Sequence, residues 1–278
     1  MKDNGHDLLQ LMESSMKVGL HFCPLEYIKV VSRELVRSLE GYKVMMPQSN
    51  RSDMLSLDTI SFMCINHDLS LYTYGSSTGS VATHSDQKEI CEKFIIHVKD
   101  NCTTVYTDGS VYRGTTGCGA CSAILFLPGA DAATHKESKA VGKMVTSTEC
   151  EIEGILLGMD MILDTLDQQR TAVHSEKTVY LFCDSISGIE AVNNPNSSLS
   201  SYNITRLNRM CEQFSTSGVK INLLHILGHT GIPGNTTADM HAKDTAYKIF
   251  KREIAAPINV SISTAFTVAG DIAKKSWQ

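Results

Sequence analysis

The chain has 278 residues, of which 42% are hydrophobic, and its formal net charge is −5 at pH 7. Its apolar runs are far shorter than the roughly 20 residues that a membrane-spanning helix needs, so we expect no membrane contact. The acidity argues against tight unaided binding of nucleic acid, because Lys and Arg supply most of the affinity for phosphates. A site whose carboxylates hold cations against a polyanion is still compatible with this charge.

Residues 1–10 are polar and do not resemble a secretory signal, so we expect an intracellular protein, in the nucleus or the cytoplasm. The nine cysteines are odd in number and follow no framework spacing, which favours reduced thiols. One Cys-x-x-Cys pair, Cys118 and Cys121, falls in a predicted strand. A spacing of three residues puts the two side chains on opposite faces of a strand, which argues against a shared metal or disulfide.

Residues 1–98 carry few signals. Apolar spacing predicts a helix within Phe22–Leu39, and β-rich runs predict short strands at Ile60–Cys64 and Leu69–Tyr74. Gly75–Asp86 is rich in Ser and Gly and is predicted to be a loop. We assign this region no function from its own residues.

From Thr103 onward the pattern predicts an ordered series of strands and helices. The expected strands are 103–108, 117–126, 136–144, 178–183 and 219–227, and the expected helices are 149–167, 185–193, 202–214 and 235–250. Three strands in succession, then alternating helices and strands, predict a mixed sheet covered by helices, an α/β architecture. A right-handed crossover would bring the strand before Asp184 beside the strand that contains Asp108.

Acidic residues stand at the ends of several predicted elements. Asp108 is expected at the exit of its strand, although Asp-Gly-Ser could also be a simple turn. Asp184 follows an apolar strand, and Asp239 lies near the start of the last helix. These positions predict that carboxylates from distant parts of the sequence meet at one edge of the sheet.

The long helix opens with three glutamates. Glu151 shares a face with Gly154 and Gly158, so we expect it to point toward the sheet. Glu149 and Glu153 fit the role of acids favoured by the helix dipole, with Glu153 facing solvent. Converging carboxylates repel one another unless cations intervene, and such oxygen ligands suit Mg²⁺ or Mn²⁺. Clusters of this kind hold two metals roughly 4 Å apart and drive phosphoryl displacement, as in nucleases or phosphotransferases.

Four motifs in one order resemble ribonuclease H. They are Thr-Asp-Gly-Ser at 107–110, Glu151 with Gly154 and Gly158, Cys-Asp-Ser at 183–185, and Gly-His-Thr-Gly-Ile-Pro-Gly-Asn-Thr-Thr-Ala-Asp at 228–239. The resemblance extends from about Thr103 to Tyr247 and is strongest to the ribonuclease H domains of non-LTR retrotransposons. It implies a mixed five-stranded sheet, three antiparallel strands and then two parallel ones, flanked by helices. The corresponding layout is an N-terminal region 1–98, a ribonuclease H-like domain 99–250 and a tail 251–278.

The resemblance also implies an activity, which is cleavage of the RNA strand of an RNA/DNA hybrid. The implied catalytic and metal-binding carboxylates, which would hold two Mg²⁺ or Mn²⁺ ions, are Asp108, Glu151, Asp184 and Asp239. His229 would assist proton transfer or product release from a mobile loop. Backbone groups of Gly109 and Ser110 are candidates for contacts to the 2′-hydroxyls that distinguish RNA from DNA.

The chain departs from the family pattern at two histidines. It has His225 where relatives carry Trp, and His241 where they carry a buried apolar residue; burial of an unpaired imidazole would cost about 1 to 3 kcal/mol. Glu92–Thr107 resembles the segment that joins reverse transcriptase to ribonuclease H, which implies a reverse transcriptase region as partner in a longer polyprotein.

Two alternatives to the enzyme are open. One is an inactive module that binds hybrid or protein; the other, a DNA-cutting integrase or resolvase, is disfavoured by the motif at 228–239.

Overall fold

The computed structural model describes residues 43–45, 63–66, 84–113, 116–168, 177–193, 201–257 and 259–261, together with the single positions 264 and 268. The helix predicted within Phe22–Leu39 and the strand predicted at Leu69–Tyr74 lie outside these residues. The chain divides into two compact units, one of residues 1–46 and 257–278 and one of residues 47–256. In the first unit, β1 (Lys43–Met45) pairs in parallel with β8 (Asn259–Ser261). The larger unit holds every other element.

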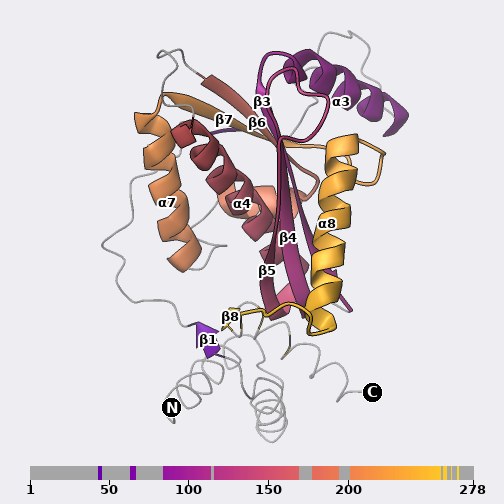
Figure 1. Ribbon diagram of the computed structural model, residues 1–278, viewed down its shortest axis with the longest axis vertical. Coiled ribbons are helices and arrows are strands. Elements are labelled where there is room, and N and C mark those ends of the chain that lie inside the picture. Colours follow the sequence, from indigo (N-terminus) through magenta and orange to yellow (C-terminus); the bar gives the residue numbers. More distant parts are fainter. Residues whose placement is uncertain are drawn as a thin grey trace, which may run out of the picture. The chain divides into compact units, whose positions relative to one another are not determined.

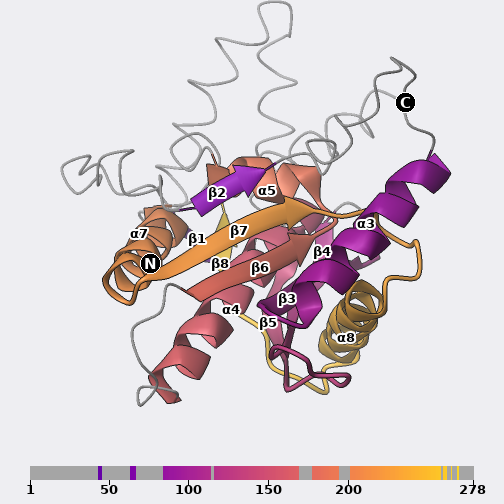
Figure 2. The same cartoon turned by 90° about the horizontal axis from the view of Figure 1, so that it is seen from above.

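The larger unit is built on one mixed sheet with the strand order β2-β7-β6-β3-β4-β5 (Figure 2). The strands are β2 (Met63–Asn66), β3 (Thr103–Tyr112), β4 (Thr116–Phe126), β5 (His135–Thr146), β6 (Lys177–Cys183) and β7 (Val219–His225). Strands β3, β4 and β5 are antiparallel, whereas β6 and β7 run parallel to β3. This confirms the predicted five-stranded ribonuclease H-like sheet. Strand β2 adds a sixth, parallel strand at the edge beside β7.

Helices cover both faces of the sheet. They are α3 (His84–Lys99), α4 (Ser147–Gln168), α5 (Ile186–Asn193), α7 (Ser201–Thr216) and α8 (Pro233–Phe250). In Figure 1, α4 and α7 lie on one side of β3, β4 and β5, and α8 lies on the other. No helix of the described residues is long and apolar enough to cross a membrane.

Alternation along β3 divides the interior into two cores. Val105 is buried on the side of α4, α5 and α7, and the next residue, Tyr106, is buried with residues of α3 and α8. The Tyr106 ring stacks on the ring of Phe182, with 5.0 Å between their centroids, and Phe94 of α3 packs edge-on against Phe182. Successive residues of a strand point to opposite faces, so this one strand contributes to both layers.

Two glycines allow α4 to approach β3 closely. A Cβ atom at Gly154 would lie 3.0 Å from the carbonyl oxygen of Asp108, and one at Gly158 would lie 2.8 Å from Cγ2 of Thr107. These contacts confirm the predicted inner face of the helix. At the helix start, the backbone N–H of Thr146 donates to Oε2 of Glu149 at 2.8 Å, and the backbone N–H of Glu149 donates to Oγ1 of Thr146 at 3.3 Å. This reciprocal pair caps the helix and accounts for Glu149.

The prediction that Glu153 faces solvent was wrong. Its side chain is only 15% exposed, and Oε2 lies 3.0 Å from Nη1 of Arg206 and 3.5 Å from Nζ of Lys139. Arg206 also forms an ion pair with Asp160. The helical spacing was correct, but α7 packs against α4 and covers this position, so Glu153 joins α4 to α7 and β5.

Several predicted boundaries were also wrong. Strand β3 continues past Asp108 to Tyr112, because its pairing with β4 extends as far as Tyr112 opposite Cys118. Helix α8 begins at Pro233, since proline is well suited to the first helical position, where its missing N–H is not needed. Helix α3 begins at His84, inside the predicted loop, and its residues Cys91, Phe94 and Val98 are buried in the core beside the sheet.

The seven cysteines described between Cys91 and Cys211 form no disulfide. Cys121 is buried in the core on the side of α4, whereas Cys118 packs in a cluster with Ala246 and Ile249 of α8. The two thiols therefore lie on opposite faces of β4, as their spacing predicted.

Candidate metal centre

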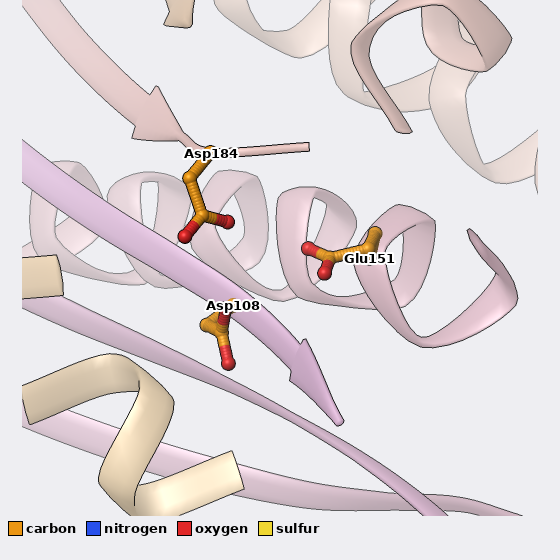
Figure 3. Close-up of side chains that lie close together, drawn as sticks. All are labelled: Asp108, Glu151 and Asp184. Carbon is orange, nitrogen blue, oxygen red and sulfur yellow. The ribbon is translucent and has the colours of Figure 1, made fainter. Parts of the chain in front are cut away.

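Three acidic side chains from separate elements meet at one edge of the sheet. Asp108 lies on β3, Glu151 lies in the first turns of α4, and Asp184 directly follows β6 (Figure 3). One carboxylate oxygen from each residue lies within 4.8 Å of the corresponding oxygens of the other two. Three carboxylates at this separation form a site of the size that a divalent cation requires.

The sheet register and the glycine contacts place these groups. Thr107 of β3 is paired with Cys183 of the parallel neighbour β6, so Asp108 and Asp184 occupy adjacent positions one residue further along. A Cβ atom at Gly109 would lie 2.3 Å from the backbone nitrogen of Glu151. Only glycine permits this approach, which brings the start of α4 against β3.

Burial and mutual repulsion set the protonation of the cluster. Asp108 is only 5% exposed, and its Oδ2 is buried without a hydrogen-bond partner among the described residues. Burial, and then the charges of Asp184 and Asp239, raise the pKa of Asp108 to about 8. Burial, followed by the charges of Asp108 and Asp184, raises the pKa of Glu151 to about 9. Both carboxylic acids therefore hold protons that a bound cation would displace.

Asp239 lies beside this cluster rather than within it. It is close enough to raise the pKa of Asp108, but among the described residues its carboxylate is engaged by Lys243, whose Nζ is 2.7 Å from Oδ1. One turn of helix separates these two residues. The hydroxyl of Ser122, opposite Asp108 on β4, donates to the carbonyl of Ala238 at 2.6 Å and so anchors α8 beside Asp239.

His229 lies in the loop between β7 and α8. Its side chain is exposed, and its backbone has a φ of 55°, a left-handed conformation that is uncommon for a residue other than glycine. The preceding Gly228 is packed against the cluster, because a Cβ atom there would lie 2.7 Å from Oδ2 of Asp184. The loop that carries His229 therefore passes directly over one of the three carboxylates.

Asn235 is a site residue that the sequence reasoning did not single out. It is 3% exposed, its Nδ2 donates to Oδ2 of Asp184 at 3.0 Å, and its Oδ1 is buried without a partner among the described residues. Its position four residues before Asp239, on the same face of α8, could have identified it.

Cys183 contacts a second carboxylate. Its Sγ lies 3.9 Å from Oε2 of Glu151 and accepts the backbone N–H of Ser185 at 3.4 Å. The hydroxyl of Ser185 in turn accepts the N–H of Gly188 at 3.1 Å and so caps the start of α5. These bonds fix the chain on both sides of Asp184.

The structure also gives the surroundings of four other positions that the motifs singled out. The backbone N–H of Gly109 interacts with the carboxylates of Asp108 and Glu151, and Ser110 is partly exposed on β3. Their contact with a substrate stays a prediction. His225 and His241 are both partly exposed, so neither carries the cost expected for a buried imidazole.

A scan against protein-family models matches ribonuclease H over residues 100–247. A search of curated proteins found no match. Among solved structures, the chain is similar to the N-terminal ribonuclease H domain of a Mycobacterium tuberculosis protein, fused to maltose-binding protein. The identity is 16%, the TM-score is 0.41, and the match covers 55% of this chain and 98% of that one. It is also similar to LC11 ribonuclease H1 in complex with an RNA/DNA hybrid, with 16% identity, a TM-score of 0.42, and coverage of 53% and 99%.

A third similar structure is the ribonuclease H domain of PFV, with 19% identity, a TM-score of 0.38, and coverage of 52% of this chain and 94% of that one. These likenesses are distant and carry no residue assignments. The family model, in contrast, spans more than half of the chain and all the carboxylates described above. The chain therefore belongs to the ribonuclease H family.

Proposed function

We propose that this chain is a metal-dependent endoribonuclease that cleaves the RNA strand of RNA/DNA hybrids by a two-metal-ion mechanism. One observation carries the proposal, namely the convergence of Asp108, Glu151 and Asp184 within 4.8 Å in a chain of the ribonuclease H family. Carboxylates this close together are costly unless protons or cations neutralise their charges, and raised pKa values are typical of catalytic sites.

The residues fit divalent cations. All the donors are carboxylate oxygens, which Mg²⁺ and Mn²⁺ prefer, and Oδ2 of Asp108 is buried with no partner among the described residues. Asp108, Glu151 and Asp184 would hold one cation. The ion pair between Asp239 and Lys243 would break, and the carboxylate of Asp239 would then help to hold a second cation. When bound, the cations would polarise the phosphodiester, activate water and stabilise the departing 3′ oxygen.

The chain's own residues would prepare this site. Asn235 holds the carboxylate of Asp184, and Cys183 lies against that of Glu151, so both ligands are oriented before a cation binds. His229 would transfer a proton or assist product release from its exposed loop. Gly109 and Ser110 would offer backbone groups to a 2′-hydroxyl of the RNA strand.

The sequence motifs further support a retroelement origin, with a reverse transcriptase region as the partner that delivers the hybrid. This part of the proposal rests on the motif block at 228–239 and on Glu92–Thr107. It predicts that the chain works on hybrids made during reverse transcription. The competing hypothesis, an inactive binding module, is an outcome of the experiment below.

The test is cleavage of an RNA/DNA hybrid whose RNA strand is end-labelled, in Mg²⁺ and in Mn²⁺. The same RNA in single-stranded form and a DNA duplex of the same sequence are run beside it, with the Asp108→Asn variant as control. We expect cutting of the hybrid RNA strand only, and loss of cutting in the variant. A folded preparation that leaves the hybrid intact in both metals would refute the enzyme; binding without cleavage would then favour the inactive module. Cleavage of the DNA duplex would favour the integrase or resolvase alternative.

A further inference from the structure

Rings and cations gather where the far end of β3 meets the end of α8. We call this the aromatic–cationic patch, and its residues are Tyr112, Arg113, Tyr247, Phe250, Lys251 and Arg252. Tyr112 is four residues beyond Asp108 on β3 and shares its face of the sheet. At the rise of a strand, this separation is about 13 Å.

The rings form the seat of the patch. The Tyr112 ring lies 4.8 Å from the Phe250 ring and 5.3 Å from the Tyr247 ring, measured between centroids. Tyr247 is 40% exposed, so the seat is open to solvent. The guanidinium carbon of Arg113 lies 4.4 Å from the Phe250 centroid, and Nζ of Lys251 lies 5.4 Å from the Tyr247 centroid.

The end of α8 fixes the positions of two of the cations. The backbone N–H of Arg252 donates to the carbonyl of Ile249 at 3.0 Å, and that of Glu253 donates to the carbonyl of Lys248 at 2.9 Å. Arg252 has a φ of 64°, so this ending is a Schellman motif with arginine in the position that glycine usually takes. Lys251 and Arg252 are thereby held at a rigid helix end rather than on a loose tail.

The patch carries three cations, and the described structure gives them no acidic partners. Arg113, Lys251 and Arg252 are exposed, and none forms an ion pair with a carboxylate of the described residues. The nearby acids are Asp244, which is paired with Lys248 at 2.6 Å, and the exposed Glu253. Within the described residues, three positive charges without acidic partners therefore lie together in a chain whose net charge is −5.

A face-on ring restrains a guanidinium but leaves the N–H groups at its edge free to donate. Such a cation binds a phosphate at a lower entropic cost than a freely rotating one. A duplex seated at the carboxylates carries a negative charge about every 1.7 Å of its axis, so phosphates lie within reach of a patch 13 Å away.

From this arrangement we propose that the aromatic–cationic patch binds the phosphate backbone of the RNA/DNA hybrid beside the cleavage site. The inference rests on the proposed function and adds to it the surface that holds the substrate. It also resolves the conflict between an acidic chain and a polyanionic ligand. The acidic edge receives cations, and the patch supplies the direct contacts to phosphate.

The experiment measures the affinity of the full chain for a labelled RNA/DNA hybrid by fluorescence anisotropy at several salt concentrations. Asp108→Asn is the background, so that the hybrid stays intact in Mg²⁺. Arg113→Ala/Lys251→Ala is compared with Lys88→Ala/Lys93→Ala, which removes the same charge from α3. For two lost phosphate contacts we expect Kd to rise by roughly tenfold or more at 0.1 M salt, and the salt slope to fall by about 1.8.

An unchanged Kd and salt slope in the patch variant would overturn the patch, provided that Asp108→Asn itself binds hybrid. An equal effect of the α3 control would also overturn it, because total charge and not location would then govern binding. If the Asp108→Asn protein, whose patch is intact, binds no hybrid, the proposal that the patch binds hybrid would also be overturned. The enzyme proposal fails separately, when the folded wild type does not cleave. Circular dichroism and the thermal midpoint show that each variant is folded.

Discussion

Asp108 within β3 and Arg113, the first residue after β3, have opposite chemistry. Asp108 is 5% exposed, lies among other carboxylates and has its pKa raised to about 8, whereas Arg113, five residues later, is exposed and rests on the Phe250 ring. A formal net charge of −5 hides this division. Overall charge therefore says little about where anions or cations can bind, because the acidic and basic groups stand at separate places along the chain.

The two regions also differ in how the fold supports them. Several independent contacts fix the geometry of the acidic end, which is the carboxylate cluster. They are the glycine contacts, the strand pairing and the bonds from Asn235 and Cys183. The cationic end is held by ring contacts and by the end of one helix. We therefore expect changes at the acidic end to affect the chemical step most, and changes at the cationic end to affect affinity.

The largest effect is expected at the cluster itself. Glu151→Gln and Asp184→Asn each remove a ligand charge while keeping shape, and metal catalysis supplies several kcal/mol of transition-state stabilisation. Single-turnover cleavage of the hybrid should slow by about a thousandfold in each variant. Glu190→Gln, an exposed acid on α5, is the matched control and should keep the wild-type rate. Comparable cleavage rates in all three variants would mean that the carboxylates of the cluster contribute no more to cleavage than an exposed acid does.

The supporting bond from Asn235 should have the next largest effect. Asn235→Ala leaves Asp184 without its amide donor, and loss of such a partner typically costs 10 to 100-fold in metal affinity or activity. The Mg²⁺ concentration for half-maximal cleavage should rise together with the loss of rate. Thr236→Ala, at the next and exposed position of α8, should behave like the wild type. Normal metal dependence in Asn235→Ala would mean that Asp184 needs no such support.

Charge reversal at the patch should give a smaller change of a different kind. Arg113→Glu/Lys251→Glu should raise KM for the hybrid by at least tenfold at 0.1 M salt and should lower kcat by much less. Steady-state kinetics at two salt concentrations measure both parameters. A drop in kcat with an unaltered KM would contradict the division of roles between the two ends.

The smallest effect is expected in stability against pH. The pKa values of Asp108 and Glu151 are raised to about 8 and about 9, so between pH 4 and pH 9 the folded protein binds more protons than the unfolded chain. In EDTA, the stabilising contribution of these protonated groups is therefore present at pH 4 and is lost as the pH rises through 8 to 9. Thermal melts should show a falling midpoint over this range, a weaker fall in Asp108→Asn, and greater protection by Mg²⁺ at pH 9 than at pH 6. A midpoint that rises from pH 6 to pH 9 in EDTA would contradict the raised pKa values.

Much of the acidic end could be predicted from sequence because its determinants are local. Strand propensity, the helical spacing of Glu151 with Gly154 and Gly158, and the crossover rule together bring Asp108 near Asp184. The sequence did not show that β3 continues beyond Asp108, since a strand ends where its partner ends. It also did not show the Lys243 partner of Asp239, which depends on rotamers across one helical turn.

The cationic end could not be predicted, because its contacts join residues far apart in the chain. Arg113 and Phe250 are separated by almost the whole domain, and only the packing of α8 on β3 and β4 brings them together. Glu153 was misjudged for the same reason, since α7 covers its face. Periodicity indicates which side of a helix is apolar, but it does not indicate which other element covers the remaining sides.

A calorimetric titration measures whether the three converging carboxylates form a divalent metal site. Mn²⁺ is titrated at pH 8 into the wild-type chain, Asp108→Asn and the Glu190→Gln control, all shown to be folded. In the wild type and the control we expect saturable Mn²⁺ binding with release of protons. In Asp108→Asn we expect Mn²⁺ binding to be lost or greatly weakened. Equal binding in all three proteins, or no binding in the folded wild type, would contradict this expectation.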